Sequence, residues 1–279
     1  MTSRISPSFT SHFLLNSHYA LHSKDLIHRI LRANVPQSSN LNDGMPRTVT
    51  AKQLFTGYDL VKIPEYQRHY TWGKENVIQF FEDLIFDIQK FHKDNTKKPR
   101  QTVYGSIIGM ERENGKIFEV IDGQQRLATL SMYILCLIHF VWKNKETSTQ
   151  LYPLLGIMNN FVVKGEVGSS TESRFDFNYT DKDYWDRIIH AFFDADSESC
   201  YDLKKSLKAV NEEAVDTERQ NNKLGIAISI LLNQIETYLG RRSSSGKDIA
   251  KILMRLWTWV ENNGAMVPSG EKGDTKKVN

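Results

Sequence analysis

The chain has 279 residues, enough for one large or two small domains, and its 40% hydrophobic and 25% charged residues are ordinary for a globular protein. The 36 basic and 33 acidic residues leave a net charge of +3, which excludes a protein that coats nucleic acid and limits any DNA contact to a local surface. No run of about 18 uncharged apolar residues is present, so we expect no membrane span.

The first predicted structure follows a polar leader. Residues 1–44 are rich in Ser and His and lack apolar periodicity, so we expect them to be poorly ordered or peripheral. Thr50 is the predicted N-cap of a short helix that ends at Gly57. Residues 60–63 then read as a strand that ends at Pro64, because proline lacks the N–H that a sheet needs.

Three polar side chains, Tyr66, Gln67 and Arg68, leave the end of this strand in a loop. The Arg68 guanidinium could donate two hydrogen bonds to phosphate oxygens, and the ring of Tyr66 or Tyr70 could stack on a base. The alternative is structural, with Tyr70 packed on the next helix and Arg68 paired with a carboxylate. Apolar residues at helical spacing over 77–91 predict that helix, which we expect to be scaffold.

A hairpin is predicted next. Residues 103–110 are typical of a strand, Asn114-Gly115 supplies a turn, and residues 117–121 alternate as a second strand. This pairing predicts that Gly105 and Ser106 lie near the centre of the sheet. Gly105 leaves room either for a ligand or for close packing.

The second hairpin strand leads directly into a helix predicted over 127–142. Asp122 is the expected N-cap, and Gly123 lets another group approach the backbone closely. Gln125 and Arg126 share a face of the first turn, where free N–H groups and the positive dipole end suit a phosphate. A capped helix start with solvated polar residues is the equally ordinary alternative.

The remainder is predicted to be helical. Residues 146–263 carry several amphipathic stripes, and Thr180 and Asp183 have the spacing of a capping box. Residues 264–279 have the Gly, Ser and Lys content of a disordered tail.

Three of these segments together resemble a known family. They are Ile-Pro-Glu-Tyr-Gln-Arg-His-Tyr-Thr-Trp at 63–72, Val-Tyr-Gly-Ser-Ile-Ile at 103–108 and Asp-Gly-Gln-Gln-Arg at 122–126. In order and spacing, over residues 45–145, they resemble the GmrSD-type restriction-endonuclease N-terminal domain family, whose core is similar to the ParB/sulfiredoxin fold. The resemblance implies an α+β fold, with a small mixed sheet and packed helices over 45–145 followed by an all-helical subdomain over 146–263.

Members of that family bind and hydrolyse nucleoside triphosphates and defend against foreign, often modified, DNA, commonly together with an HNH-type nuclease. Carried onto this chain, the resemblance implies catalytic roles for Asp122, Gln124, Gln125 and Arg126, with Asp122 as the expected Mg²⁺ ligand. One glutamine would orient the attacking water, while Arg126 and Arg68 neutralise phosphate charge. The implied nucleotide-binding residues are Tyr66, Gln67, Arg68, Gly105, Ser106 and Gly123.

Two departures and two alternatives complete the interpretation. The family's following Asn-Arg-Gly block is not legible, and no His/Asn/His cluster follows, so we expect the sensor half of a restriction system, with the HNH-type nuclease acting in trans. Ala128-Thr129 replaces the usual Thr-Thr, which should leave the site intact. A ParB-like nucleotide- or DNA-binding switch without turnover is the first alternative, separated by whether phosphate is released.

A sulfiredoxin-like redox enzyme is the other alternative. It needs a reactive cysteine in the phosphate-binding turn, and neither Cys136 nor Cys200 lies there. The two cysteines also form no disulfide framework or metal-binding pattern, which fits a cytoplasmic protein.

Overall fold

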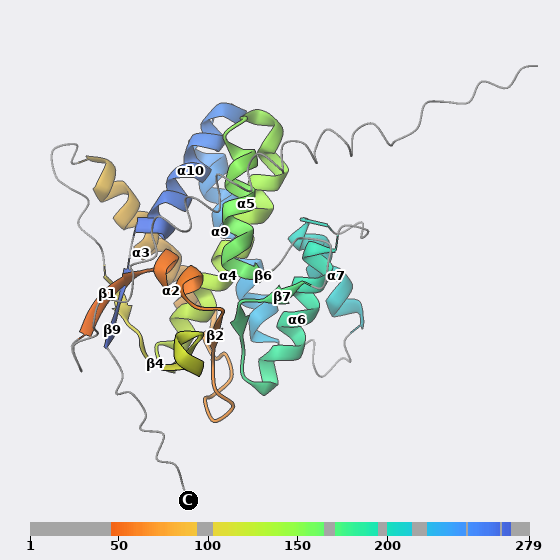
Figure 1. Cartoon of the computed structure of the whole chain (residues 1–279). Coiled ribbons are helices and arrows are strands. Elements are labelled where there is room, and N and C mark those ends of the chain that lie inside the picture. Colours follow the sequence, from red (N-terminus) through yellow and green to blue (C-terminus); the bar gives the residue numbers. More distant parts are fainter. Residues whose placement is uncertain are drawn as a thin grey trace, which may run out of the picture. The chain divides into compact units, whose positions relative to one another are not determined.

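The computed structural model describes residues 46–93, 103–164, 171–194, 200–213, 222–243, 245–262 and 264–268 (Figure 1), and these residues all belong to one compact unit. Its helices are α2 (Ala51–Gly57), α3 (Lys74–Lys93), α4 (Gln124–Asn144), α5 (Leu151–Val162), α6 (Tyr179–Phe193), α7 (Leu203–Glu213), α9 (Lys223–Arg242) and α10 (Gly246–Asn262). Two 3-10 turns are η1 (Glu113–Gly115) and η2 (Lys145–Thr147). The strands are β1 (Pro46–Thr50), β2 (Leu60–Lys62), β3 (Val103–Ser106), β4 (Ile108–Arg112), β5 (Ile117–Asp122), β6 (Val163–Lys164), β7 (Glu172–Ser173), β8 (Phe175–Asp176) and β9 (Gly264–Pro268).

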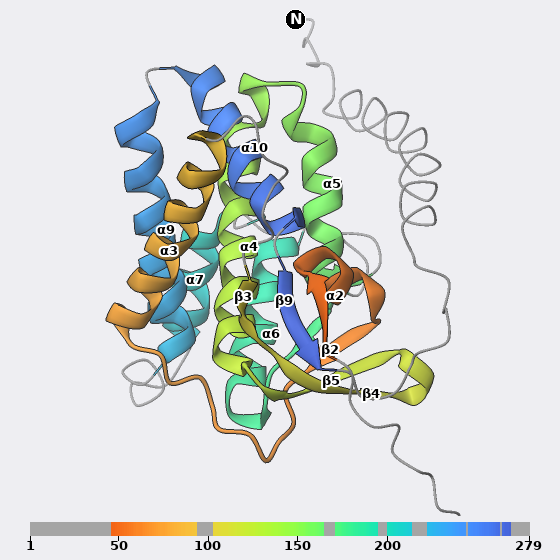
Figure 2. The ribbon, with the colours of Figure 1, turned by 90° about the vertical axis from the view of Figure 1, so that its left-hand side faces the viewer.

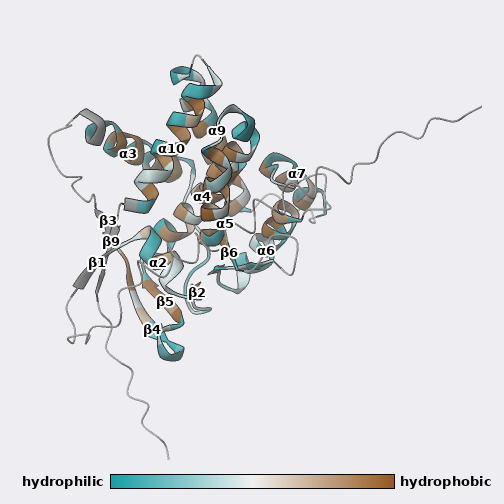
Figure 3. Cartoon of the chain, turned by 45° about the horizontal axis from the view of Figure 1, so that its top comes forward, coloured by the Kyte–Doolittle hydropathy of each residue, from teal (hydrophilic) through white to brown (hydrophobic). Residues whose placement is uncertain are grey.

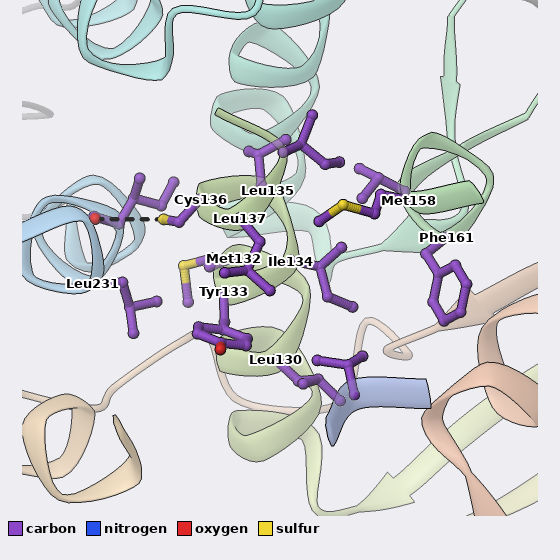
Figure 4. Packing of buried hydrophobic residues seen from close by; sticks show 14 of the residues in the cluster. Leu130, Met132, Tyr133, Ile134, Leu135, Cys136, Leu137, Met158, Phe161 and Leu231 are labelled. Atoms are coloured by element: carbon purple, nitrogen blue, oxygen red, sulfur yellow. Dashed lines mark hydrogen bonds between the residues drawn. The ribbon is translucent and has the colours of Figure 1, made fainter. Parts of the chain in front are cut away.

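Helix α4 is the centre of the core. Every residue from Leu127 to Val141 is buried, because the apolar residues of this helix cover its whole circumference rather than one stripe. Figure 4 shows its side chains packed against Met158 and Phe161 of α5 and Leu231 of α9. On another side, the ring of Tyr133 lies 6.3 Å from the ring of Phe81 in α3. Helices α5, α9 and α10 all contact α4 (Figure 2).

The covering helices are amphipathic. In α3, six apolar residues that fall on one face are buried: Val77, Phe80, Phe81, Leu84, Ile85 and Ile88. Figure 3 shows the same division, with hydrophobic colour concentrated on α4 and α5 and hydrophilic colour on outward faces of α3 and α7. The predicted scaffold role of the helix over 77–91 is consistent with this burial.

A four-stranded mixed sheet carries the chain into α4. Its order is β4-β5-β2-β8, with β5 antiparallel to β4 and β2 parallel to both β5 and β8. Val61, Phe118, Val120 and Phe175 bury one face of the sheet. The expected α+β class is therefore confirmed, while the finer likeness to the ParB/sulfiredoxin fold stays a prediction.

The predicted hairpin between residues 103–110 and 117–121 forms only from Ile108 onward. Residues 108–112 pair with 117–122 around η1, where Asn114 and Gly115 have positive φ angles of 57° and 82°. Residues 103–106 leave that sheet and pair with β9 in a second one, of order β1-β9-β3. The expectation that Gly105 and Ser106 lie near the centre of the main sheet is therefore wrong.

Two expectations about the later part of the chain also need correction. Residues 146–263 are not all helical, because β6, β7 and β8 lie among them and β8 joins the main sheet beside β2. These strands have two residues each, too short for an alternating pattern to be visible. Residues 264–268, expected in a disordered tail, form β9 between β1 and β3. The rest of that tail and the leader over 1–44 lie outside the described residues.

Of the helix caps predicted at Thr50 and Thr180, the structure has the first and not the second. Thr50 caps α2 as predicted, since its hydroxyl accepts from Gln53 N and the Gln53 side chain accepts from Thr50 N. The capping box predicted at Thr180 is misplaced by two residues, because Asn178 is the N-cap of α6 and its side chain accepts from Asp181 N.

Among the described helices one, α4 continued by η2 over Gln124–Thr147, is long and apolar enough to cross a membrane by length and composition. However, 83% of its apolar window is buried inside the protein. It therefore behaves as a core helix, and the expectation of no membrane span is consistent with its packing.

Gly109 tests how tightly β4 packs. A Cβ there would press into the Phe118 ring and lie 2.7 Å from the Glu119 carbonyl oxygen, at a point where the register with β5 shifts. We expect Gly109→Ala to lower the free energy of unfolding by about 1–3 kcal/mol. Each kcal/mol lost should lower the melting temperature by roughly 2–4 °C. Gly57→Ala is the matched control, since nothing lies within 4 Å of its added Cβ. Equal melting temperatures for the two variants would contradict this packing.

Candidate functional site

The candidate site forms where β2 and β5 end. Because these strands are parallel, with Leu60 opposite Ile117 and Lys62 opposite Glu119, their carboxyl ends meet at one edge of the sheet. The loop that follows β2 and the turn that follows β5 therefore lie together. The first and third blocks of the family resemblance, far apart in sequence, meet here.

The turn into α4 differs from the predicted one. Asp122 is the last residue of β5, and the N-cap is Gly123, with φ 87° and ψ 7°, so the expected Asp122 cap is wrong. The Asp122 carboxylate instead accepts from Gly123 N at 2.8 Å. No side chain caps the helix, and its first turn contains no acidic residue. The left-handed backbone at Gly123 explains why glycine stands there.

Both glutamines of the motif hold the neighbouring loop. Gln124 Nε2 donates to the Arg68 carbonyl oxygen at 3.2 Å. Gln125 uses both ends of its amide, since Nε2 donates to the His69 carbonyl oxygen at 3.1 Å and Oε1 accepts from Thr71 N at 2.8 Å. Each glutamine side chain is only 6% exposed. Gln125 is thus fully occupied by the backbone, and the geometry does not support it as the residue that orients water.

A third glutamine and a buried tyrosine, both from the loop itself, bind it to β5 and α4. Gln67 Nε2 donates to the Ile121 carbonyl oxygen at 2.8 Å, which ties the loop to the end of β5. The Tyr70 hydroxyl lies 2.8 Å from Thr129 Oγ1, and Thr129 Oγ1 donates to the Gln125 carbonyl oxygen. Because the Thr129 hydroxyl donates to Gln125, the Tyr70 hydroxyl is the donor to Thr129, and burial raises the pKa of the Tyr70 phenol, which keeps it protonated.

The charged side chains of the site face outward. Asp122, Arg126, Arg68 and Tyr66 are all exposed, Tyr66 by 71%. Neither arginine has an ion-pair partner within the described part of the chain, and Tyr66 makes only a long contact of 3.5 Å from its hydroxyl to Glu119 Oε1. The helix start therefore combines buried amides that hold the loop with free charges directed to solvent.

One atom of this cluster lacks a partner. Gln124 Oε1 is buried and accepts no hydrogen bond from any described residue. A buried acceptor without a donor costs about 1–3 kcal/mol, which a bound water or ligand group would recover. This atom belongs to the first residue of α4, whose start also lacks a side-chain cap.

A metal ion would have few protein ligands here. No group of three or more His, Cys, Asp or Glu side chains gathers among the described residues. Mg²⁺ that accompanies a nucleotide needs only one or two carboxylates, because phosphate oxygens and waters complete its shell. The exposed carboxylate of Asp122 fits that requirement, whereas an all-protein metal site is not supported.

The remaining predicted residues are only partly placed. Gly123 lies in the turn itself, but only the backbone strand of Gly105 and Ser106 is described, so their nucleotide contacts stay predictions. Their strand, β3, is followed by Ile108, the register partner of Asp122. The second sequence block therefore ends beside the motif turn.

Two residues that were not predicted from the sequence also bind the Gln67–Thr71 loop. Asn178 Nδ2 donates to the Gln67 carbonyl oxygen at 2.9 Å, and Asp181 Oδ2 accepts from Tyr70 N at 2.6 Å. Both lie at the start of α6, more than 100 residues from the loop. The available signal was the Asn-x-x-Asp spacing of a helix start, which also fits Thr180 and Asp183.

Comparison with known proteins identifies the family. A family model described as GmrSD restriction endonuclease, N-terminal domain, matches residues 51–262, from α2 through α10. The match thus extends well past the 45–145 range that carries the three sequence blocks. No curated protein matches the chain. The chain therefore belongs to the family of GmrSD restriction endonuclease N-terminal domains.

Proposed function

We propose that this chain is the nucleoside-triphosphate-binding and hydrolysing sensor domain of a modification-dependent DNA restriction system. Family membership implies a restriction endonuclease system in phage defence. The nucleotide-dependent part rests on one observation: the start of α4 has no side-chain cap and no acid in its first turn, yet carries the exposed Arg126.

That arrangement favours an anion. A helix N-terminus carries about half a positive charge, so a cation in its first turn is unfavourable by roughly 0.3–1 kcal/mol unless an anion offsets it. The second guanidinium, Arg68, lies on the loop that Gln124 holds against the same turn. A polyphosphate would accept from the free N–H groups of the turn and from both arginines.

Hydrolysis needs little more than positioning. In phosphoryl transfer to water, the protein orients the water and neutralises the developing charge. Gln124 suits the first task better than Gln125, because Gln124 Oε1 has no partner and can accept from a water. Asp122 would hold Mg²⁺, which supplies further neutralisation of phosphate charge when bound.

The other partners follow from the same proposal. Nucleotide binding would regulate cleavage of DNA, in particular modified DNA, by an HNH-type nuclease that acts in trans. Such a system operates on DNA in the cytoplasm.

A nucleotide- or DNA-binding switch without turnover is the second candidate. It is favoured by the use of the Gln125 amide and the Gln124 nitrogen for holding the loop, which leaves few groups for catalysis. The redox alternative has no comparable support. Cys136 is buried in α4, and burial raises the pKa of its thiol, while Cys200 lies between α6 and α7.

Replacement of Arg126 tests the proposed phosphate contact. Arg126→Ala removes a charge-assisted contact to phosphate, so nucleotide affinity should fall roughly ten- to a hundredfold, with the melting temperature nearly unchanged because the side chain is exposed. Calorimetry with each nucleoside triphosphate measures the affinity. Arg241→Ala, which removes an exposed arginine from the far end of α9, is the control. Equal affinity in both variants would remove Arg126 from the site.

Gln125 should behave differently. Gln125→Ala breaks two hydrogen bonds to the loop, so stability, nucleotide affinity and phosphate release should all decrease together. This outcome differs from that of a water-orienting residue, whose loss lowers turnover and spares binding. Melting curves, calorimetry and phosphate release on one preparation distinguish the two. A variant with normal melting and normal binding but slow release would restore the catalytic role.

The chain by itself should not cut DNA. Incubation with modified and unmodified plasmid, Mg²⁺ and nucleoside triphosphate should leave supercoiled plasmid intact, because the described residues contain no metal cluster of the nuclease kind. Gel electrophoresis measures nicking. Cleavage that disappears in an Asp122→Ala variant would place a nuclease site in this chain.

A further inference from the structure

The loop over Gln67–Thr71 is held from two directions. From one side, the α4 glutamines bind the backbone of Arg68, His69 and Thr71. From the other side, the first turn of α6 binds the two remaining residues, through Asn178 to the Gln67 carbonyl and through Asp181 to Tyr70 N. Five consecutive residues thus each have a backbone group bound to a side chain from elsewhere in the chain.

Such an arrangement exceeds what a connecting loop needs. Surface loops ordinarily satisfy their backbone groups with water, at no cost in side-chain ordering. Here the backbone of Arg68 and His69 is fixed while their side chains stay exposed. The result is a rigid presentation of two cationic or titratable groups, which is the usual property of a binding loop on a scaffold.

The hydrogen bond from Tyr70 N to Asp181 requires a carboxylate to be partly removed from water. The carboxylate is half-buried, and burial raises its pKa, whereas the hydrogen bond from Tyr70 N and the nearby His69 lower it. An acid in the first turn of a helix is already favourable when it stays in water. Its burial against the loop is therefore explained by the loop and not by the helix.

We propose that the first turn of α6 is a second side of the nucleotide site, in which Asn178 and Asp181 are positioning residues that hold Gln67–Thr71 so that Arg68 and His69 face the phosphates. This inference rests on the proposed nucleotide function. It also couples the site to a helix from the later part of the chain. Because the coupling between two sites is reciprocal, nucleotide binding should slow amide hydrogen exchange at the start of α6. A substitution that loosens the start of α6 should in turn weaken nucleotide binding.

Three variants separate this role from helix capping. Asn178→Ser keeps a capping hydroxyl for Asp181 N but loses the amide that donates to Gln67. Asp181→Ala loses the acceptor for Tyr70 N, and Asp181→Asn retains one. The control is Asp183→Ala, since that side chain is 80% exposed on the same helix.

Amide hydrogen exchange over the peptide 66–72 reads the loop directly, without any ligand. We expect exchange roughly tenfold faster in Asn178→Ser and Asp181→Ala, with slow exchange retained in α4 as evidence of an intact core. Nucleotide affinity should fall roughly two- to tenfold in the same two variants. Asp181→Asn should restore both properties, and the Asp183 control should change neither.

The outcomes are distinguishable. Unchanged exchange in Asn178→Ser and Asp181→Ala would overturn the positioning role, whatever the nucleotide result. Faster exchange with unchanged affinity would overturn the link between α6 and the nucleotide site. Absence of nucleotide binding by the unaltered protein, with faster exchange in the variants, would instead refute the proposed function and leave α6 as the support of a loop with another ligand.

Discussion

The complete burial of α4 is the constraint on which the rest of the structure depends. A helix that is apolar on every side must be covered on every side, and α3, α5, α9 and α10 supply that cover. The Gln67–Thr71 loop lies beside its N-terminus, and the backbone groups of that loop find partners inside the protein. Gln124 and Gln125 provide them from the helix itself. The fold and the candidate site therefore share one set of hydrogen bonds.

This sharing divides the Asp-Gly-Gln-Gln-Arg motif into two kinds of residue. Successive helical residues point about 100° apart, so neighbours in sequence face different surroundings. The two glutamines face the loop and are buried, whereas Asp122 and Arg126 face solvent. The glutamines are part of the folded structure before any ligand binds. The two charged residues contribute little to the core and are free to act on a ligand.

The sequence predicted those features that follow from local chemistry or from long periodic patterns. The Thr50 cap, the buried face of α3 and the passage from β5 into α4 are of this kind. The role of Gln125 was beyond sequence reasoning, because an amide that binds backbone and one that binds water look identical in a motif. The same holds for β8 and β9, whose few residues join sheets through partners distant in the chain.

Three helix starts of this chain argue together for a ligand at α4. Thr50 and Gln53 complete a capping box on α2, and Asn178 caps α6 with Asp181 in its first turn. These starts show the local chemistry that stabilises a helix. The start of α4 has a glycine at the N-cap, no acid in its first turn and an exposed arginine, although α4 is the most buried helix of the core. Helix α5 also begins without a side-chain cap or an acid, so the feature that sets α4 apart from it is the exposed arginine in its first turn. A charge placed against the local rule is typical of a functional site. A phosphate would add negative charge to this turn, where the acid nearest in sequence, Asp122, precedes the helix.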